Sequence, residues 1–292
     1  MNTLPDKSSH ISRFLIGVLA LSFLGVAQAR CIGQSDSKIE PVSIAVVPQL
    51  PVATVHSQWA PLLQRLGQDI GLCFDLTINA SIPEFETLLL RGKPDLAFAN
   101  PYHVVMAHKK QNYIPLVADG KNLLTGIVVA RKDSKFKNVA DLQGQIVAFP
   151  APNAFAASLL IRASLANKGV KIQPQYVKTH TNVYRDVILG QAVAGGAVNN
   201  TLRKEPEEVK QMIQVIYETP GYRPHPLIAK SSLSPTLRNS ITRGIIALGQ
   251  TPEGAAMLDA VQLGNPITVT YEKDYAPLEK LGLEKYVVSD TQ

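Results

Sequence analysis

Two hydrophobic patterns alternate along most of the chain. Residues 42–47 form a short, apolar, β-branched run closed by Pro48, which predicts a buried strand. Residues 54–70 carry apolar side chains at helical spacing and stop before Gly71, a residue that commonly ends a helix. The same alternation predicts a strand at 74–80, a helix at 83–90, a strand at 95–99 and a helix at 101–108.

The alternation starts again after an extended stretch at 123–130. Segments 88–100 and 186–198 share one order of helix, glycine, apolar strand and turn. Strands that alternate with helices predict parallel sheets covered on both faces. The elements predicted in this second part are a helical turn at 139–142, a strand at 145–149, a helix at 153–168, a strand at 175–178, a helix at 184–189 and a strand at 192–198.

We therefore expect an α/β protein of two lobes, each a mainly parallel sheet flanked by helices. Lobe 1 is predicted to comprise residues 30–124 and 222–292, and lobe 2 to comprise residues 125–221. The chain then crosses between the lobes near Thr125-Gly126 and Gly221-Tyr222, where small residues can absorb a hinge rotation. Because parallel sheets bind ligands at the carboxyl ends of their strands, the ligand cleft is expected between the lobes.

The first 29 residues predict a cleaved signal peptide. Lys7 and Arg13 precede an uncharged apolar run at 14–26, which ends in the small residues of Ala27-Gln28-Ala29. The run is 13 residues long, and a membrane-spanning helix needs roughly 20. Cys31 follows the expected cleavage site, but Arg30 stands where a lipoprotein signal needs a small residue. We therefore expect a soluble periplasmic protein.

The charge of the chain argues against one class of partner. The formal net charge is +6, and it becomes +5 when the first 29 residues, with two basic and one acidic side chain, are removed. The excess is spread along the sequence without a long Lys/Arg run, so we expect no nucleic-acid partner. A mildly positive protein instead suits a small anionic ligand.

Cys31 and Cys73 are the two cysteines of the chain. In an oxidising compartment such a pair often forms a disulfide. From the loss of loop entropy, this disulfide would stabilise the folded protein by about 4 kcal/mol. The alternative is two unpaired thiols, with Cys73 as a small buried residue. Their spacing, without a neighbouring histidine pair, is not typical of a zinc site, and no metal or other cofactor is expected.

Three segments resemble one known family. They are Asp95-Leu-Ala-Phe-Ala-Asn-Pro-Tyr-His103, Ala148-Phe-Pro-Ala-Pro-Asn-Ala-Phe-Ala-Ala-Ser158, and His180 followed by Val183-Tyr-Arg-Asp-Val187. In this order they resemble the periplasmic binding proteins of phosphate, phosphite and phosphonate ABC importers, from Ile44 to about Tyr286. The resemblance implies a type II periplasmic binding fold, which closes on an oxyanion and hands it to a permease in the inner membrane.

Asn153 begins the candidate oxyanion site. As a helix N-cap it would leave the backbone N–H groups of Ala154, Phe155, Ala156 and Ala157 without helical partners, and such groups form an anion site. The alternative is an ordinary helix start that meets water. The resemblance places this helix start against the oxyanion. Its relatives carry a Ser-Thr-Ser run here, whereas Ala154, Phe155 and Ala156 lack those hydroxyls.

Other candidates come from the resemblance and from topology. His180 matches a histidine that contacts the oxyanion in the relatives, and Tyr102 and His103 end a strand in the other lobe. Tyr102 could equally be an aromatic residue on the rim. Asn199 falls near an acidic residue that relatives use for a ligand amine, so it argues against an aminoalkyl tail. Gln49 and Ser81 are further candidates for ligand contact, only because each follows the end of a predicted strand.

Two other functional classes compete with transport. An enzyme is not expected, because the sequence lacks a Gly-x-Ser-x-Gly elbow, a histidine pair at metal spacing and a phosphate-binding glycine loop. A ligand-loaded binding protein can also dock on a sensor histidine kinase and report an oxyanion such as arsenite. The sequence does not separate this role from delivery to a permease. In either role we expect a monomer.

Overall fold

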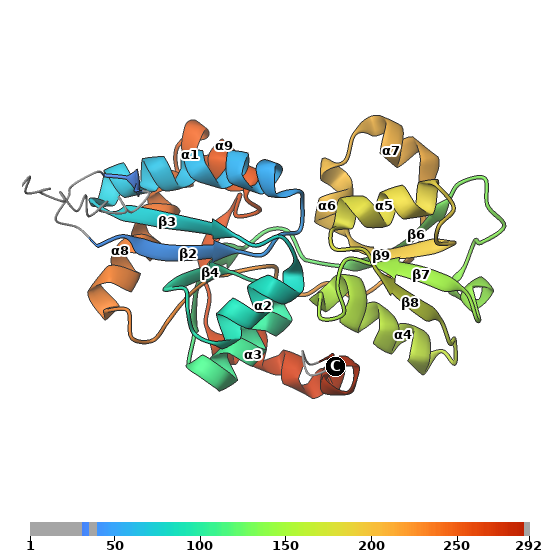
Figure 1. Ribbon diagram of the computed structural model, residues 1–292. Coiled ribbons are helices and arrows are strands. Elements are labelled where there is room, and N and C mark those ends of the chain that lie inside the picture. Colours follow the sequence, from blue (N-terminus) through green and yellow to red (C-terminus); the bar gives the residue numbers. More distant parts are fainter. Residues whose placement is uncertain (1–30, 35–39, 289–292) are drawn as a thin grey trace, which may run out of the picture.

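The computed structural model describes residues 31–34 and 40–288, which form two α/β bodies side by side (Figure 1). The predicted signal peptide at 1–29, with Lys7 and Arg13, lies outside the described residues. Among the described helices, none has both the length and the apolar character needed to span a bilayer.

The first body contains a seven-stranded sheet in the order β1-β3-β2-β4-β11-β5-β12. Strand β2 pairs in parallel with β3 and β4, whereas β11, inserted between β4 and β5, is antiparallel to both. The strands are β1 Ile32–Gly33, β2 Val42–Val46, β3 Cys73–Ile78, β4 Leu96–Phe98, β5 Ile114–Asp119, β11 Leu227–Ala229 and β12 Pro266–Thr268.

Helices cover both faces of this sheet. Helix α1 packs with α8 and α9 on one face, and α2 and α3 lie on the other (Figure 1). The helix predicted at 54–70 is confirmed as α1, which ends at Gly71 in the left-handed conformation (φ 69°). The helices are α1 Val52–Ile70, α2 Ile82–Leu90, α3 Pro101–Gln111, α8 Pro235–Leu248 and α9 Pro252–Ala260, followed by the short turns η3 Tyr271–Tyr275, η4 Ala276–Leu281 and η5 Leu283–Tyr286.

The second body contains a five-stranded sheet in the order β10-β6-β9-β7-β8. Strand β7 is parallel to β8 and β9, and β6 is antiparallel to β9 and β10. Both β6 and β11 enter their sheets from the other body, which explains why they run against their parallel neighbours. The strands are β6 Gly126–Arg131, β7 Ile146–Phe149, β8 Gln173–Tyr176, β9 Ala194–Val198 and β10 Ile213–Glu218.

One helix of the second body differs from its prediction. The segment expected to be helical from 153 begins at Phe155 as a π-helical turn, η2 Phe155–Leu160, and continues as α4 Ile161–Asn167. The other helical elements of this body are η1 Val139–Leu142, α5 His180–Ile188, α6 Asn199–Lys204 and α7 Glu207–Met212.

The two bodies are joined by paired chain crossings. Leu124 and Tyr222 exchange two backbone hydrogen bonds of 2.9 Å each, immediately beside the predicted hinge positions. The first sheet uses residues up to Asp119 and from Leu227, and the second uses residues 126–218. We refer to these bodies as lobe 1 and lobe 2. Their boundaries as moving units stay a prediction.

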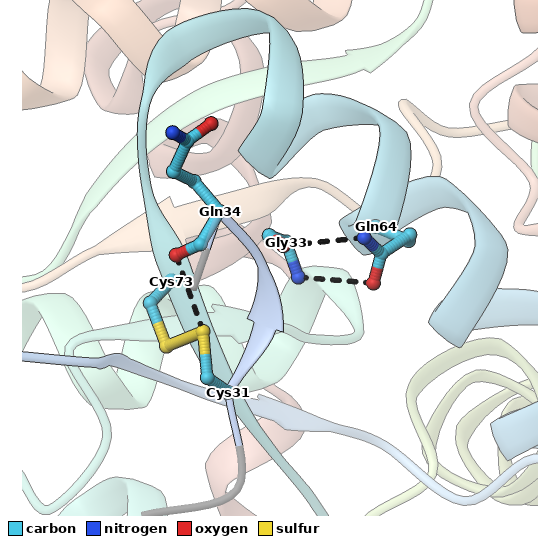
Figure 2. The surroundings of a disulfide bond; sticks show 5 residues. All are labelled: Cys31, Gly33, Gln34, Gln64 and Cys73. Atoms are coloured by element: carbon cyan, nitrogen blue, oxygen red, sulfur yellow. Dashed lines mark hydrogen bonds between the residues drawn. A yellow bond between two sulfur atoms is a disulfide. The ribbon is translucent and has the colours of Figure 1, made fainter. Parts of the chain in front are cut away.

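A disulfide joins Cys31 to Cys73 beside β1 (Figure 2). The Cα atoms are 5.2 Å apart. The backbone of Gly33 also exchanges two hydrogen bonds with the side-chain amide of Gln64 on α1, at 3.1 and 3.2 Å (Figure 2). These contacts fasten the start of the described chain to the sheet and to α1.

Candidate functional site

A small cavity lies between the two lobes, and we call it the oxyanion cavity. Its free volume is about 10 Å³, which is roughly the space that one water molecule occupies. The lobes are therefore closely apposed. Lobe 1 contributes Val47, Gln49, Ile82, Asn100 and His225, and lobe 2 contributes Ala154, Phe155, Ala156, Ala157, His180 and Val198.

Three residues that line this cavity have unpaired backbone donors. Within the described chain, the N–H groups of Phe155, Ala156 and Ala157 form no hydrogen bond. The first carbonyl of the turn, that of Ala154, accepts from the N–H groups of Ser158 and Leu159, which lie further along the helix. These donors stand at the start of a continuous helical segment, 155–167. Unpaired N–H groups and the positive end of a helix together favour an anion.

Glycines explain why this segment lies so close to the sheet. A Cβ atom on Gly126 of β6 would lie 2.1 Å from the carbonyl oxygen of Ala156. A Cβ atom on Gly196 of β9 would lie 2.3 Å from the carbonyl oxygen of Ala157. Because neither strand has a side chain at these points, the backbone of η2 rests directly on the sheet. This contact fixes the direction of the free N–H groups.

Asn153 is not the N-cap that the sequence predicted. The residue before η2 is Ala154, and it makes no side-chain cap. The Asn153 amide instead donates to both oxygens of Glu86 and to the carbonyl of Val288, and its Oδ1 accepts from the N–H of Val288. The buried Glu86 carboxylate needs donors, and Asn153 supplies them. Asn153 therefore supports the site from behind and does not line the cavity.

Two buried histidines face each other across the lobes. His180 begins α5 in lobe 2, and His225 precedes β11 in lobe 1; both line the oxyanion cavity. Burial lowers the pKa of each to about 3, with the neighbouring His180 and His103 adding to the effect at His225. Both rings are therefore neutral near pH 7. Neither Nδ1 atom has a hydrogen-bond partner among the described residues.

His225 is a site residue that the sequence analysis missed. It lies between Pro224 and Pro226, just before β11, and proline on its C-terminal side favours an extended backbone. Its Nε2 atom contacts the Nε2 atom of Gln49. The two flanking prolines were the available signal, because they present a lone histidine on a rigid segment.

Gln49 lies at the cavity, as the strand-end argument suggested. Its backbone carbonyl accepts from the N–H of His180 at 3.2 Å, which links the two lobes. Its Oε1 atom accepts from the side chain of Gln262 at 2.7 Å, and Gln262 in turn accepts from Asn200 at 2.5 Å. A row of side-chain amides thus runs from the cavity across the interlobe boundary.

Tyr102 and His103 do not line the cavity. Tyr102 packs into the core of lobe 1. His103 is fully buried, with its ring 5.5 Å from that of Phe85 and its Nε2 atom 3.5 Å from Glu86. The preceding Asn100 lines the cavity instead, and its Oδ1 atom caps α3 by accepting from the N–H of His103. Helical geometry turns the two predicted residues inward, away from the strand end.

Asn199 and Ser81 have structural contacts elsewhere. The Asn199 side chain accepts from the N–H of Thr125 at 3.3 Å and donates to the carbonyl of Leu123 at 3.0 Å, so it holds the first crossing. Ser81 caps α2, where its hydroxyl accepts from the N–H of Glu84 and donates to that carboxylate. Neither side chain lines the oxyanion cavity.

In the part of the chain that the structure describes, no group of three or more metal-ligating side chains is close enough to hold a metal.

Known proteins share this architecture. The phosphonates-binding periplasmic protein of Escherichia coli K12 is 24% identical over 279 residues, which cover 86% of this chain and 78% of the relative. A solved binding protein component of an ABC phosphonate transporter from Pseudomonas aeruginosa has a TM-score of 0.75 at 16% identity, covering 83% of this chain and 85% of its own. PhnD1 from Prochlorococcus marinus, solved with methylphosphonate, has a TM-score of 0.76 at 15% identity, covering 85% and 98%.

These structural likenesses confirm the two-lobed type II periplasmic binding fold. A family model described as the periplasmic substrate-binding protein of phosphonate ABC transporters matches residues 44–275. The match spans both lobes and includes all eleven residues that line the oxyanion cavity. The chain therefore belongs to the family of periplasmic substrate-binding proteins of phosphonate ABC transporters.

Proposed function

We propose that this chain is exported to the periplasm, captures a small phosphonate between its lobes and delivers it to an ABC permease in the inner membrane. It acts as a monomer and catalyses no reaction. One observation carries the proposal: Phe155, Ala156 and Ala157, whose N–H groups are unpaired, line the same cavity as His180 and His225.

The donors suit a tetrahedral oxyanion. Backbone N–H groups do not depend on side-chain identity, so they persist although Ala154, Phe155 and Ala156 replace the hydroxyl residues of the relatives. A neutral imidazole can donate from one nitrogen and accept with the other. At His225 the Nε2 atom contacts Gln49, so its Nδ1 atom is the one left for a ligand. The histidines can therefore bind both an ionised oxygen and a protonated one.

The remaining lining favours a phosphonate over inorganic phosphate. Val47, Ile82 and Val198 are apolar, and no lining side chain of this cavity carries a formal charge with the histidines neutral. A phosphonate presents one carbon substituent in place of an oxygen. Apolar walls stabilise that carbon, whereas they leave a fourth phosphate oxygen without a partner.

The named relatives support the same ligand class and output. The Escherichia coli relative is a phosphonates-binding protein, and the Prochlorococcus structure holds methylphosphonate. The family description names an ABC transporter. The alternative role, as co-receptor of a sensor kinase for an oxyanion such as arsenite, receives no support from these relatives.

Calorimetry on the mature protein tests the proposal. The panel is methylphosphonate, phosphite, aminoethylphosphonate, phosphate, sulfate and arsenite. We expect methylphosphonate to bind more tightly than phosphate and sulfate. His180→Ala should weaken methylphosphonate binding about 10- to 100-fold, because a hydrogen bond to a charged group contributes about 1.5 to 3 kcal/mol.

A matched control is His56→Ala, since His56 is exposed on α1 and lies outside the cavity. It should leave the affinity unchanged. If no member of the panel binds, the proposed function is wrong. If methylphosphonate binds equally well to the His180→Ala protein, the site assignment is wrong while the function stands.

A further inference from the structure

A second and larger cavity lies between the lobes, and we call it the polar cavity. Its free volume is about 330 Å³, against about 10 Å³ for the oxyanion cavity. Lobe 1 contributes Asp119, Asn122, Leu123, Pro224, Asp259 and Gln262, and α6 of lobe 2 contributes Asn200, Arg203 and Lys204.

The row of side-chain amides lies between the two cavities. Gln49 lines the oxyanion cavity, whereas Gln262 and Asn200 line the polar cavity. The hydrogen bonds from Gln262 to Gln49, at 2.7 Å, and from Asn200 to Gln262, at 2.5 Å, join them. Side-chain amides can rotate without moving the backbone, so the Gln262 side chain is the group that a ligand reaching both spaces would have to displace.

Two charges in the polar cavity remain available to a ligand. Lys204 is engaged, because its ammonium group donates to the carbonyl oxygens of Asp259 and Ala260. Asp119 is engaged by the N–H of Lys121 and the amide of Asn122. Among residues 31–34 and 40–288, however, neither the Arg203 guanidinium nor the Asp259 carboxylate forms a side-chain hydrogen bond or ion pair. These two charges have opposite sign and belong to opposite lobes. Burial lowers the pKa of Lys204 and the nearby Asp259 carboxylate opposes that shift, but no hydrogen bond joins the two side chains.

We propose that the polar cavity receives the organic part of the ligand, and that the natural ligand is a phosphonate whose organic part carries both an amino group and a carboxylate. This inference rests on the proposed function. The phosphonate group occupies the oxyanion cavity, Arg203 binds the carboxylate and Asp259 binds the ammonium group. A planar guanidinium can hold a carboxylate through two parallel hydrogen bonds.

The expectation that an amine is disfavoured came from Asn199. That side chain is committed to the backbone of the first crossing, so it does not decide whether an amine binds. The acidic group that an amine can reach lies at Asp259. A ligand that spans both cavities contacts both lobes through each of its ends, and it therefore stabilises the closed arrangement more than methylphosphonate does.

Calorimetry with two probes tests the inference, namely methylphosphonate and phosphonoalanine, an α-amino-carboxylate phosphonate. Phosphonoalanine should bind the unaltered protein at least tenfold more tightly. Arg203→Gln and Asp259→Asn should each weaken phosphonoalanine binding at least tenfold and change methylphosphonate binding less than twofold. The matched controls Arg243→Gln and Asp75→Asn alter exposed residues outside both cavities and should change neither affinity.

The outcomes separate the two proposals. The inference is overturned, and the proposed function stands, if methylphosphonate binds but phosphonoalanine binds no more tightly. The same holds if the affinity for phosphonoalanine is unchanged in the Arg203→Gln and Asp259→Asn variants. If both variants weaken both probes equally, the charges act on closure in general, and the inference is again overturned. If neither probe binds, the proposed function fails and the subsite with it.

Discussion

The side-chain amide of Asn153 donates to both carboxylate oxygens of Glu86, at 2.8 and 3.0 Å, and so joins the two lobes. Both residues are buried, with exposed fractions of 3% and 9%. Asn153 lies two residues before the free N–H of Phe155, and its own carbonyl accepts from Asn100 at 3.4 Å. The contact therefore holds the anion-binding segment against lobe 1.

Asn153→Ala should destabilise the protein and weaken ligand binding. The substitution leaves a buried Glu86 carboxylate without its amide donors, which costs about 1 to 3 kcal/mol. Chemical denaturation measures the loss of stability, and calorimetry with methylphosphonate measures the loss of affinity. Asn167→Ala is the control, because Asn167 is exposed at the end of α4. Equal stability of the two variants would contradict the role given to Asn153.

The contact also shows where sequence reasoning reaches its limit. Asn100 and Asn153 each stand just before a different helical segment. The sequence alone does not tell which of the two asparagines caps the segment that follows it. Asn100 does, because its Oδ1 atom meets the N–H of His103. Asn153 does not, because its Oδ1 atom accepts from the N–H of Val288, 135 residues later. A partner so distant along the chain leaves no local pattern.

Much of the fold was predictable because its signals are local. Apolar spacing and Gly71 define α1, and the strand–helix alternation indicates both lobes. Strand β5, Ile114–Asp119, gave no such clear signal, since Pro115 interrupts its apolar run. The site was less predictable, because its cavity is assembled from residues between Val47 and His225 that approach one another only after folding.

Gly126→Ala should disturb the anion-binding segment directly. The added Cβ atom would lie 2.1 Å from the carbonyl oxygen of Ala156, so the backbone of η2 has to move. Overpacking of this kind typically costs about 1 to 3 kcal/mol. We expect lower stability in denaturant and weaker methylphosphonate binding.

Gly120→Ala provides the matched control for this prediction. There the added Cβ would meet the side chain of Ile267, whose nearest atom is 2.7 Å away. That side chain is 39% exposed and can move aside. If both glycine variants bind methylphosphonate as the unaltered protein does, the close approach of η2 to β6 has no part in ligand binding.

The buried histidines should make the fold sensitive to acid. Burial lowers the pKa of His180 and His225 to about 3 in the folded protein, and an unfolded histidine has a pKa of about 6.5. Between these values the unfolded state binds more protons, so stability falls as the pH is lowered from about 6.5 towards 3. Each histidine can contribute a slope of at most about 1.4 kcal/mol per pH unit.

Denaturation at several pH values checks this sign. His180→Gln and His225→Gln should each have a shallower fall in unfolding free energy below pH 6.5 than the unaltered protein. His56→Gln, at an exposed position of α1, should keep the original slope. A slope that stays the same in both cavity variants would show that these rings are not the groups that take up the protons.

Ligand entry should require the lobes to rotate apart about the two crossings. The oxyanion cavity has a free volume of about 10 Å³, too little for a phosphonate, so the closed arrangement has to open before binding. The crossings at Leu124 and Tyr222 are joined by two backbone hydrogen bonds, and they form a short paired ribbon about which the lobes can turn.

Small-angle scattering should therefore give a larger radius of gyration without ligand than at saturation with methylphosphonate. The His180→Ala protein, at the same ligand concentration, should keep the larger radius because it binds weakly. An unchanged radius on saturation of the unaltered protein would rule out hinge closure, since two lobes that rotate together must bring their mass closer to the common centre.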